Sequence, residues 1–244
     1  NFWRAVTDND MGAQSQKNFA AWRTPKMKLR SLTVDKKLKT AVAVYNMPAV
    51  KSTLTLTYQV EANGTLVVTQ DLKTTPGAKV SEMLRFGMVM NLPYDMDQVQ
   101  WNGRGPVENY SDRKISQNVG IYHSTADDLF YPYIRPQETG TMSDLRWWNQ
   151  TNKNGVGFRV ESDKLFSASA LHYDLLTLDE GKEKKQRHSQ SVEKSKYTNL
   201  FIDLVQSGVG GVDSWGGDGR ARKGHRVEYK DYTFSFRIAP KTLY

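Results

Sequence analysis

Apolar and polar residues alternate with a period of two along much of the chain, starting near Leu38, Val42 and Val44. This period is typical of a β-strand with one buried and one solvated face. The clearest example is a pair of runs: Leu54, Leu56, Tyr58, Val60 and then Leu66, Val68, Gln70. The pair Asn63-Gly64 between them suits a type I′ turn. Residues 53–62 and 65–74 are therefore predicted to form an antiparallel hairpin.

Similar segments recur along the chain and predict further strands near 83–91, 97–102, 155–161, 166–173, 198–205 and 229–238. The segments between them are too short for helical crossovers, which favours an antiparallel all-β architecture. Only residues 13–23 have the pattern of a short helix, which Pro25 would end.

Two stretches, 103–149 and 206–226, break the alternation and are rich in Gly, Pro, Trp, Tyr and charged residues. They are predicted to be long irregular loops, which often carry function on a β scaffold. There is no internal repeat and no low-complexity linker, so residues 1–244 are predicted to form one domain.

The composition narrows the class of protein. The chain has 38% hydrophobic and 25% charged residues, and no apolar run approaches the roughly 20 residues of a membrane-spanning helix. The absence of cysteine excludes disulfides and thiolate nucleophiles from this chain. The opening Asn1-Phe2-Trp3-Arg4 reads as the interior of a longer polypeptide, and the cellular location is left open.

The net charge of +8 raises the hypothesis of an anionic partner. The basic residues are scattered among acidic ones, whereas nucleic-acid binders concentrate charge on one element, so nucleic-acid binding is ranked last. The densest run, Lys182 to Arg187, contains Glu183 and is predicted to be a solvated hairpin rather than an anion-binding patch.

Several carboxylates occur in pairs, and a glycosidase needs two of them at a defined separation. The pairs are Asp8/Asp10, Glu108/Asp112, Asp127/Asp128 and Glu138/Asp144. Spacing on loops cannot set that separation. The favoured interpretation is that these groups fix loops by bonding to Arg113, Arg135 and Arg146, and that Asp8-Asn9-Asp10 caps a turn before Gly12.

Other motifs point to little chemistry. Gly208 to Asp213 superficially resembles a dinucleotide fingerprint, but it has no third glycine and no helix pattern after it. Gly103-Arg104-Gly105 fails for a related reason, because Pro106 follows. The four histidines, His123, His172, His188 and His225, lack metal-ligand spacing, so no metal site is expected.

Asp213-Ser214-Trp215-Gly216-Gly217 is more informative, because small and flexible neighbours cannot cover an indole well. Aromatic rings bind the apolar faces of sugars, so an exposed Trp215 would make a carbohydrate platform. The alternative is a Trp215 ring folded back onto the sandwich. Trp147-Trp148 could serve similarly, although one of two adjacent strand residues normally points inward.

Taken together, four segments resemble the C-terminal domain of family-2 β-galactosidases in the same order along the chain. They are Phe2-Trp3-Arg4-Ala5-Val6-Thr7-Asp8-Asn9-Asp10-Met11-Gly12, Gly103-Arg104-Gly105-Pro106-Val107-Glu108-Asn109-Tyr110-Ser111-Asp112-Arg113, Tyr131-Pro132-Tyr133-Ile134-Arg135-Pro136-Gln137-Glu138-Thr139-Gly140 and Gly210-Gly211-Val212-Asp213-Ser214-Trp215. The four segments extend over nearly the whole chain, which makes the resemblance specific.

The resemblance implies a large antiparallel β-sandwich, a supersandwich related to galactose mutarotase folds, as the fifth domain of a retaining β-galactosidase. It further implies that a TIM barrel elsewhere in the polypeptide carries both catalytic glutamates, so no catalytic residue is expected here. Full-length family enzymes typically use Mg and Na in other domains; the oligomeric state, with a homo-oligomer as one alternative, is left open. Trp215, with Asp213 and Ser214, is expected to contact the β-galactoside.

This chain departs from the family pattern at two positions: Val6 stands where the family usually has Pro, and Val212 where it often has a second Asp. Neither change removes the tryptophan, but both put the loop geometry and the substrate preference in doubt. Mutarotase activity is not implied, because no His and Glu match that enzyme's motifs. The loops of 103–149 are expected to expose apolar side chains toward the barrel. The alternative is a free-standing carbohydrate-binding module.

Overall fold

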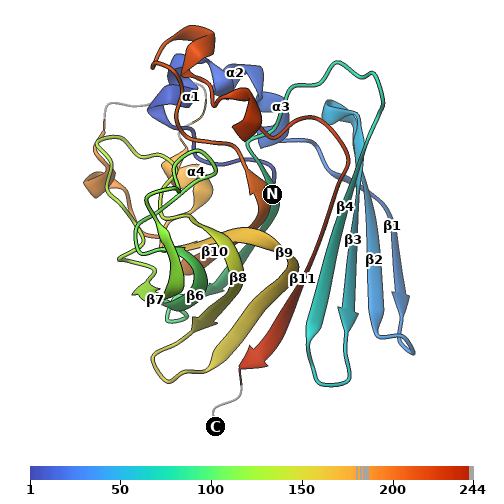
Figure 1. Ribbon diagram of the computed structural model, residues 1–244. Coiled ribbons are helices and arrows are strands. Elements are labelled where there is room, and N and C mark those ends of the chain that lie inside the picture. Colours follow the sequence, from blue (N-terminus) through green and yellow to red (C-terminus); the bar gives the residue numbers. More distant parts are fainter. Residues whose placement is uncertain (180, 182, 184–186, 242–244) are drawn as a thin grey trace.

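The computed structural model describes residues 1–179, 181, 183 and 187–241, and its main elements are antiparallel strands (Figure 1). The strands are β1 Lys28–Asp35, β2 Thr40–Met47, β3 Ser52–Val60, β4 Leu66–Thr74, β5 Arg85–Pro93, β6 Gln98–Gly105, β7 Asn118–Thr125, β8 Met142–Thr151, β9 Gly157–Leu171, β10 Tyr197–Gln206 and β11 Tyr232–Lys241. The pairings between them are antiparallel. The predicted antiparallel all-β class is confirmed.

The helices are short. They are α1 Asp8–Gly12, α2 Ser15–Asn18, α3 Ala20–Arg23 and α4 Leu175–Leu178, with 3₁₀ turns η1 Pro48–Val50, η2 Ser189–Ser191, η3 Gly216–Gly219 and η4 Lys223–His225. The helix predicted over 13–23 is therefore two separate turns, interrupted at Phe19, and a third turn precedes it. In the described part of the chain no helix has the length and apolar character to cross a membrane.

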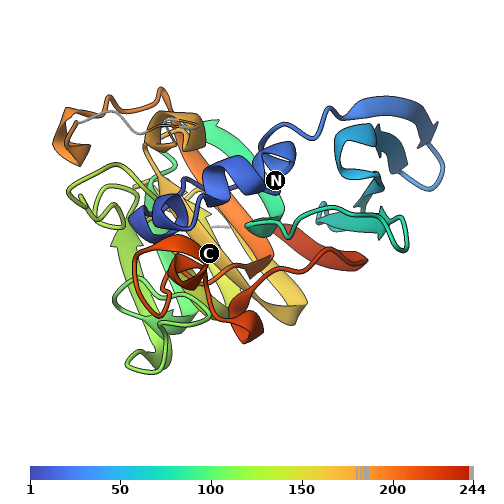
Figure 2. The ribbon, with the colours of Figure 1, turned by 90° about the horizontal axis from the view of Figure 1, so that it is seen from above.

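The sheet runs in the order β1-β2-β3-β4-β11-β9-β8-β6-β7, and β10 pairs with both β9 and β5. The last strand, β11, thus lies between β4 and β9 and joins the first four strands to the others (Figure 1). Figure 2 shows α1 to α3 lying across one end of this assembly. The N-terminal segment, the helices and the loop before β11 meet at that end.

The predicted hairpin is confirmed, with β3 and β4 paired from Ser52↔Thr74 to Val60↔Leu66. The predicted type I′ turn is wrong, because that turn needs a positive φ at both central residues. Gly64 has φ +85°, whereas Asn63 is not among the residues with positive φ. Gly64 N donates to Glu61 O, and Asn63 Oδ1 instead accepts a hydrogen bond from Thr65 N.

Three strands, β1, β7 and β8, lie where the hydrophobic pattern did not predict a strand. β7 and part of β8 fall in 103–149, which is therefore not one irregular loop. β9 is continuous from Gly157 to Leu171, so the segments predicted at 155–161 and 166–173 belong to a single strand. β1 was missed because the pairing register shifts between Leu29 and Ser31. Such a bulge breaks the period of two.

The core is formed by buried side chains of the strands and includes the N-terminal segment. Phe2, Trp3, Ala5 and Val6 are buried. The Phe2 ring lies 5.3 Å from the ring of Trp22. This packing anchors the chain immediately before α1. The basic run Lys182 to Arg187 lies outside the described residues except for Glu183 and Arg187, so its hairpin stays a prediction.

Candidate functional site

Trp215 lies on the loop between β10 and β11, and its side chain is 77% exposed. Its backbone is held, because Trp215 N donates to Asp213 Oδ1 over 2.8 Å and Gly219 N donates to Trp215 O over 3.1 Å. The loop therefore closes on itself and leaves the indole outside. The alternative of a Trp215 ring folded onto the sandwich is wrong.

The base of this loop is fixed by Asp112. Its two carboxylate oxygens accept hydrogen bonds from Val209 N over 3.1 Å and from Gly210 N over 2.9 Å. A Cβ at Gly208 would lie 2.3 Å from Asp112 Oδ2, so a side chain there would displace the carboxylate. The absence of a side chain at Gly208 thus allows the backbone to approach a carboxylate closely.

The tip of the loop is fixed by α1. Thr7 caps this helix, and Asp10 completes a capping box by accepting a hydrogen bond from Thr7 N over 2.9 Å. Asn9 Nδ2 donates to Asp213 O over 3.2 Å. A Cβ at Gly12 would lie 1.9 Å from Ser214 O. The capping role predicted for Asp8-Asn9-Asp10 is confirmed for Asp10, and α1 positions the backbone beside Trp215.

Arg4 connects the N-terminal segment to the same loop. Its buried guanidinium lies 2.9 Å from Asp10 Oδ2 and donates to Gly208 O over 2.9 Å. It also donates to the carbonyl oxygen of Ser207. A buried ion pair whose guanidinium also donates to two backbone carbonyls fixes geometry well. Sequence reasoning missed this role, although Arg4 lies in the first of the four motifs.

Glu108 joins the second motif to the third. Its Oε2 accepts hydrogen bonds from Gly140 N over 2.7 Å and from Thr139 Oγ1 over 3.1 Å. Its Oε1 accepts from the Tyr133 hydroxyl and forms an ion pair with Arg113. Burial, together with the hydrogen bond to Glu108, raises the pKa of Tyr133 to about 12. Glu108 is thus fully engaged in holding loops.

Residues of the first three motifs, together with Val209 just before the fourth, line one hollow of about 210 Å³. The lining residues are Thr7, Asp8, Asn9, Tyr110, Arg113, Tyr133, Gln137, Glu138 and Val209. Asn9 belongs to this hollow and also bonds to the carbonyl of Asp213, so the hollow and the Trp215 loop are neighbours. Three of the motifs thereby form a floor beside the exposed indole.

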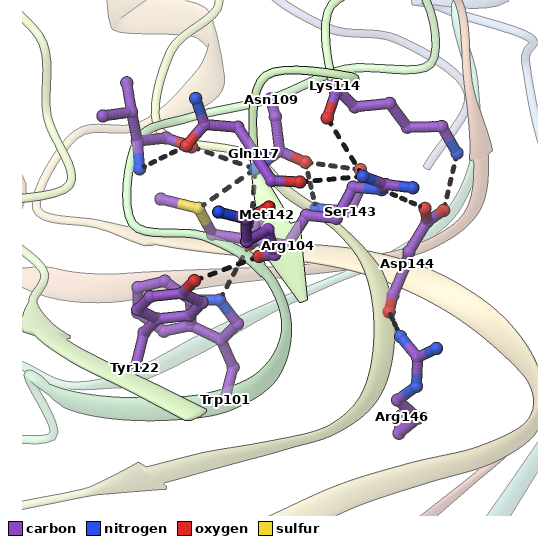
Figure 3. A network of polar contacts seen from close by, with 12 residues as sticks. Trp101, Arg104, Asn109, Lys114, Gln117, Tyr122, Met142, Ser143, Asp144 and Arg146 are labelled. Carbon is purple, nitrogen blue, oxygen red and sulfur yellow. Dashed lines mark hydrogen bonds and ion pairs between the residues drawn. The ribbon is translucent and has the colours of Figure 1, made fainter. Parts of the chain in front are cut away.

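Ion pairs and hydrogen bonds join the end of β6 and the segment that follows it to β8 (Figure 3). Asp144 lies 2.6 Å from Arg104 Nε and 2.7 Å from Lys114 Nζ, and Arg104 also donates to Gln117 O over 2.8 Å. Asn109 Oδ1 accepts from Ser143 N over 3.1 Å. These contacts make the second motif rigid before it reaches Asp112.

The loop-fixing role of the paired carboxylates is confirmed for the two pairs around this site. Arg113 pairs with Glu108, and Arg135 lies 3.7 Å from Asp8. Arg146 differs from the prediction, because it donates to the backbone carbonyl of Asp144 rather than to its carboxylate.

The other carboxylates also have partners. Glu138 lies 3.7 Å from buried Arg85. Asp127 bonds to His172 and Lys194. In the described residues no group of three or more His, Asp or Glu could hold a metal ion.

The other tryptophan pair does not present a sugar platform. Trp148 is fully buried, as expected for one member of an adjacent strand pair. Trp147 is half-buried, and the guanidinium of Arg159 lies 4.4 Å from its ring centroid. The arginine occupies the face on which a sugar would stack.

The model of the family described as "Beta galactosidase small chain" matches residues 1–238. The chain belongs to the β-galactosidase small-chain family. The predicted resemblance is confirmed at this level.

Curated β-galactosidases are similar to this small-chain domain over most of its length. That of Lactobacillus delbrueckii subsp. bulgaricus is 35% identical over 88% of the chain and 21% of that protein. That of Priestia megaterium is 30% identical over 88% of the chain and 20% of that protein. The chain thus spans about a fifth of the length of these relatives. A galactose mutarotase related enzyme from Lactobacillus acidophilus is similar in structure, with a TM-score of 0.42, 10% identity and coverage of 91% of this chain and 73% of that one.

Proposed function

We propose that this chain is the C-terminal accessory domain of a family-2 retaining β-galactosidase and that Trp215 stacks on the β-galactoside at the mouth of the active site. The observation that carries the proposal is the combination of a 77% exposed indole with a backbone tied to α1 and Asp112. A rigid, exposed aromatic ring binds the apolar face of a sugar with little loss of conformational freedom.

The bond-breaking carboxylates belong elsewhere in the polypeptide. A retaining glycosidase needs one free carboxylate as nucleophile and a second as acid and base. Beside Trp215, Asp112 accepts two backbone hydrogen bonds, Asp10 is paired with Arg4, and Glu108 is paired with Arg113. Carboxylates held in this way position loops, so the domain contributes binding and the TIM barrel of the same polypeptide contributes the chemistry.

The two residues that differ from the family pattern, Val6 and Val212, differ in burial. Val6 is fully buried in the core, whereas Val212 is exposed next to Asp213. The loop therefore lacks one carboxylate beside the platform that related enzymes often carry. We expect this change to alter polar contacts to the leaving group of the substrate while the stacking surface is retained.

The test is Trp215→Ala in the full-length enzyme. Aromatic stacking is worth about 0.5–1.5 kcal/mol, so KM for lactose should rise about two- to tenfold, with kcat largely retained. Trp215→Phe keeps a ring and should restore part of the affinity. Unchanged KM values in the Ala variant would contradict the role of Trp215.

A further inference from the structure

The first three strands have one polar and one apolar face. Residues directly opposite one another on neighbouring strands point to the same face of a sheet. On the apolar face the pairing forms three rows: Leu29, Tyr45, Leu54; Leu32, Ala43, Leu56; and Val34, Ala41, Tyr58. The alternate row Thr33, Val42, Thr57 belongs to the other face. We call the three rows the apolar face of β1–β3.

The apolar face of β1–β3 is buried in the core at β3 and becomes solvent-exposed toward β1. Leu54 is 3% exposed, whereas Leu32 and Val34 are 60% and 61% exposed. Leu56 and Tyr58 lie between them and are half-buried. In both ribbon views β1, β2 and β3 project away from the body of the protein (Figures 1 and 2). Contiguous exposed apolar surface of this kind marks an interaction site.

Basic side chains surround the exposed edge. Five exposed residues on β1 and the following turn form a basic rim: Lys28, Arg30, Lys36, Lys37 and Lys39. Asp35 is the one acidic residue among positions 28–39, and it accepts backbone hydrogen bonds from Lys37 and Leu38. In the described part of the chain no carboxylate forms an ion pair with the basic rim. Its charge is thus available to a partner.

We propose that the apolar face of β1–β3 docks against another domain of the same polypeptide, whose contact surface is apolar and has an acidic edge. This rests on the proposed function, because it takes the chain to be one domain of a longer enzyme. The relatives are about five times as long as this chain, so they contain further domains able to cover the face. A second copy fits less well, because two basic rims would face each other and repel.

The proposed surface is separate from the Trp215 site. The loop of Trp215 contacts α1, whereas Leu32 and Val34 belong to the edge strand β1. Figure 1 shows α1 and β1 well apart. Substitutions on β1 can therefore be tested without changing the sugar platform, and docking can be measured without an activity assay.

The experiment compares two introduced cysteines in the full-length protein, because this chain contains none. Leu32→Cys lies on the apolar face, and Thr33→Cys is the matched control on the opposite face of the same strand. Both sites are exposed in this domain. We expect maleimide labelling, measured by peptide mass spectrometry, to be at least about tenfold slower at position 32 than at position 33, independent of protein concentration. A carbodiimide should cross-link Lys36 or Lys37 to carboxylates in another domain of the same polypeptide.

Three results would overturn the proposal. Equal labelling rates at the two positions would show that the apolar face stays uncovered. Protection that disappears on dilution would assign the face to a second copy. Protection that appears only when anionic lipid vesicles or DNA are added would assign it to those surfaces instead. Each of these results is independent of the KM measured for the Trp215 variants, so the failure of one proposal is distinguishable from failure of the other.

Discussion

At the scale of single residues, the position of Trp215 depends on atoms that are distant in sequence. Ser214 O lies against Gly12, and Asp213 O accepts a hydrogen bond from Asn9. The sequence predicts an indole flanked by small residues, and this exposure is confirmed. It does not predict which backbone atoms hold the loop, because contacts between residues about 200 positions apart have no local pattern.

Gly12 provides a test of this positioning. Gly12→Ala would place a methyl group 1.9 Å from Ser214 O, so α1 and the Trp215 loop must separate. We expect KM in the full-length enzyme to rise about as much as in Trp215→Ala, with kcat largely retained, since the indole is displaced rather than removed. Gly217→Ala is the matched control, because nothing lies within 4 Å of its added Cβ. A Gly12 variant with the parent KM would show that the loop does not depend on this contact.

At the scale of elements, the sequence predicts strands well where both faces follow the period of two, as in β3 and β4. It fails at β1, where the shift in register places Leu29 and Leu32 on one face at a spacing of three. It also fails at β7, an edge strand whose Val119 and Ile121 are exposed. The expected exposure of apolar side chains within 103–149 is confirmed, and their contact with the barrel stays a prediction.

Asp144 tests how the segment after β6 is held. Burial alone would raise the pKa of Asp144, but hydrogen bonds from Lys114 and Arg104 outweigh it and lower the pKa below its ordinary value. A lowered carboxyl pKa stabilises the fold above the unfolded-state pKa, and this contribution is lost as the pH falls through the folded-state pKa. Asp144→Asn suits the left-handed φ of +53° and removes the charge together with one of the two accepting oxygens.

We therefore expect Asp144→Asn to lower the free energy of unfolding of the domain by about 1 kcal/mol near neutral pH. The gap from the parent should narrow as the pH is lowered below about 4, measured by urea denaturation at several pH values. Asp163→Asn, at an exposed position on β9, is the control and should change little. A gap that stays constant on acidification would rule out the ion pairs as its cause.

At the scale of the whole molecule, three of the motifs are far apart in the chain and yet line one hollow, and the fourth, with Trp215, lies beside it. The sequence alone predicts that they belong together only through the family resemblance, because local patterns do not specify which loops meet. At this end Asp10, Asp112 and Glu108 are engaged in hydrogen bonds and ion pairs that hold loops. This arrangement supports the proposal that the domain contributes binding and that the catalytic carboxylates lie elsewhere.

We accordingly expect the purified domain to show no hydrolysis of a chromogenic β-galactoside above the uncatalysed background. The full-length enzyme at equal molarity is the positive control. Turnover that persists through successive purification steps and is abolished by a substitution within this chain would contradict the assignment of the chemistry to another domain.

The place of β11 in the sheet has a consequence for biosynthesis. This strand is among the last segments of the described chain to leave the ribosome, and it alone bridges β4 and β9 in the described sheet. Until it arrives, the first four strands form a meander with two open edges, which is an aggregation hazard for a nascent chain. Closure of the sheet is thus a late, long-range event, and the open edges of the meander stay exposed until β11 has paired.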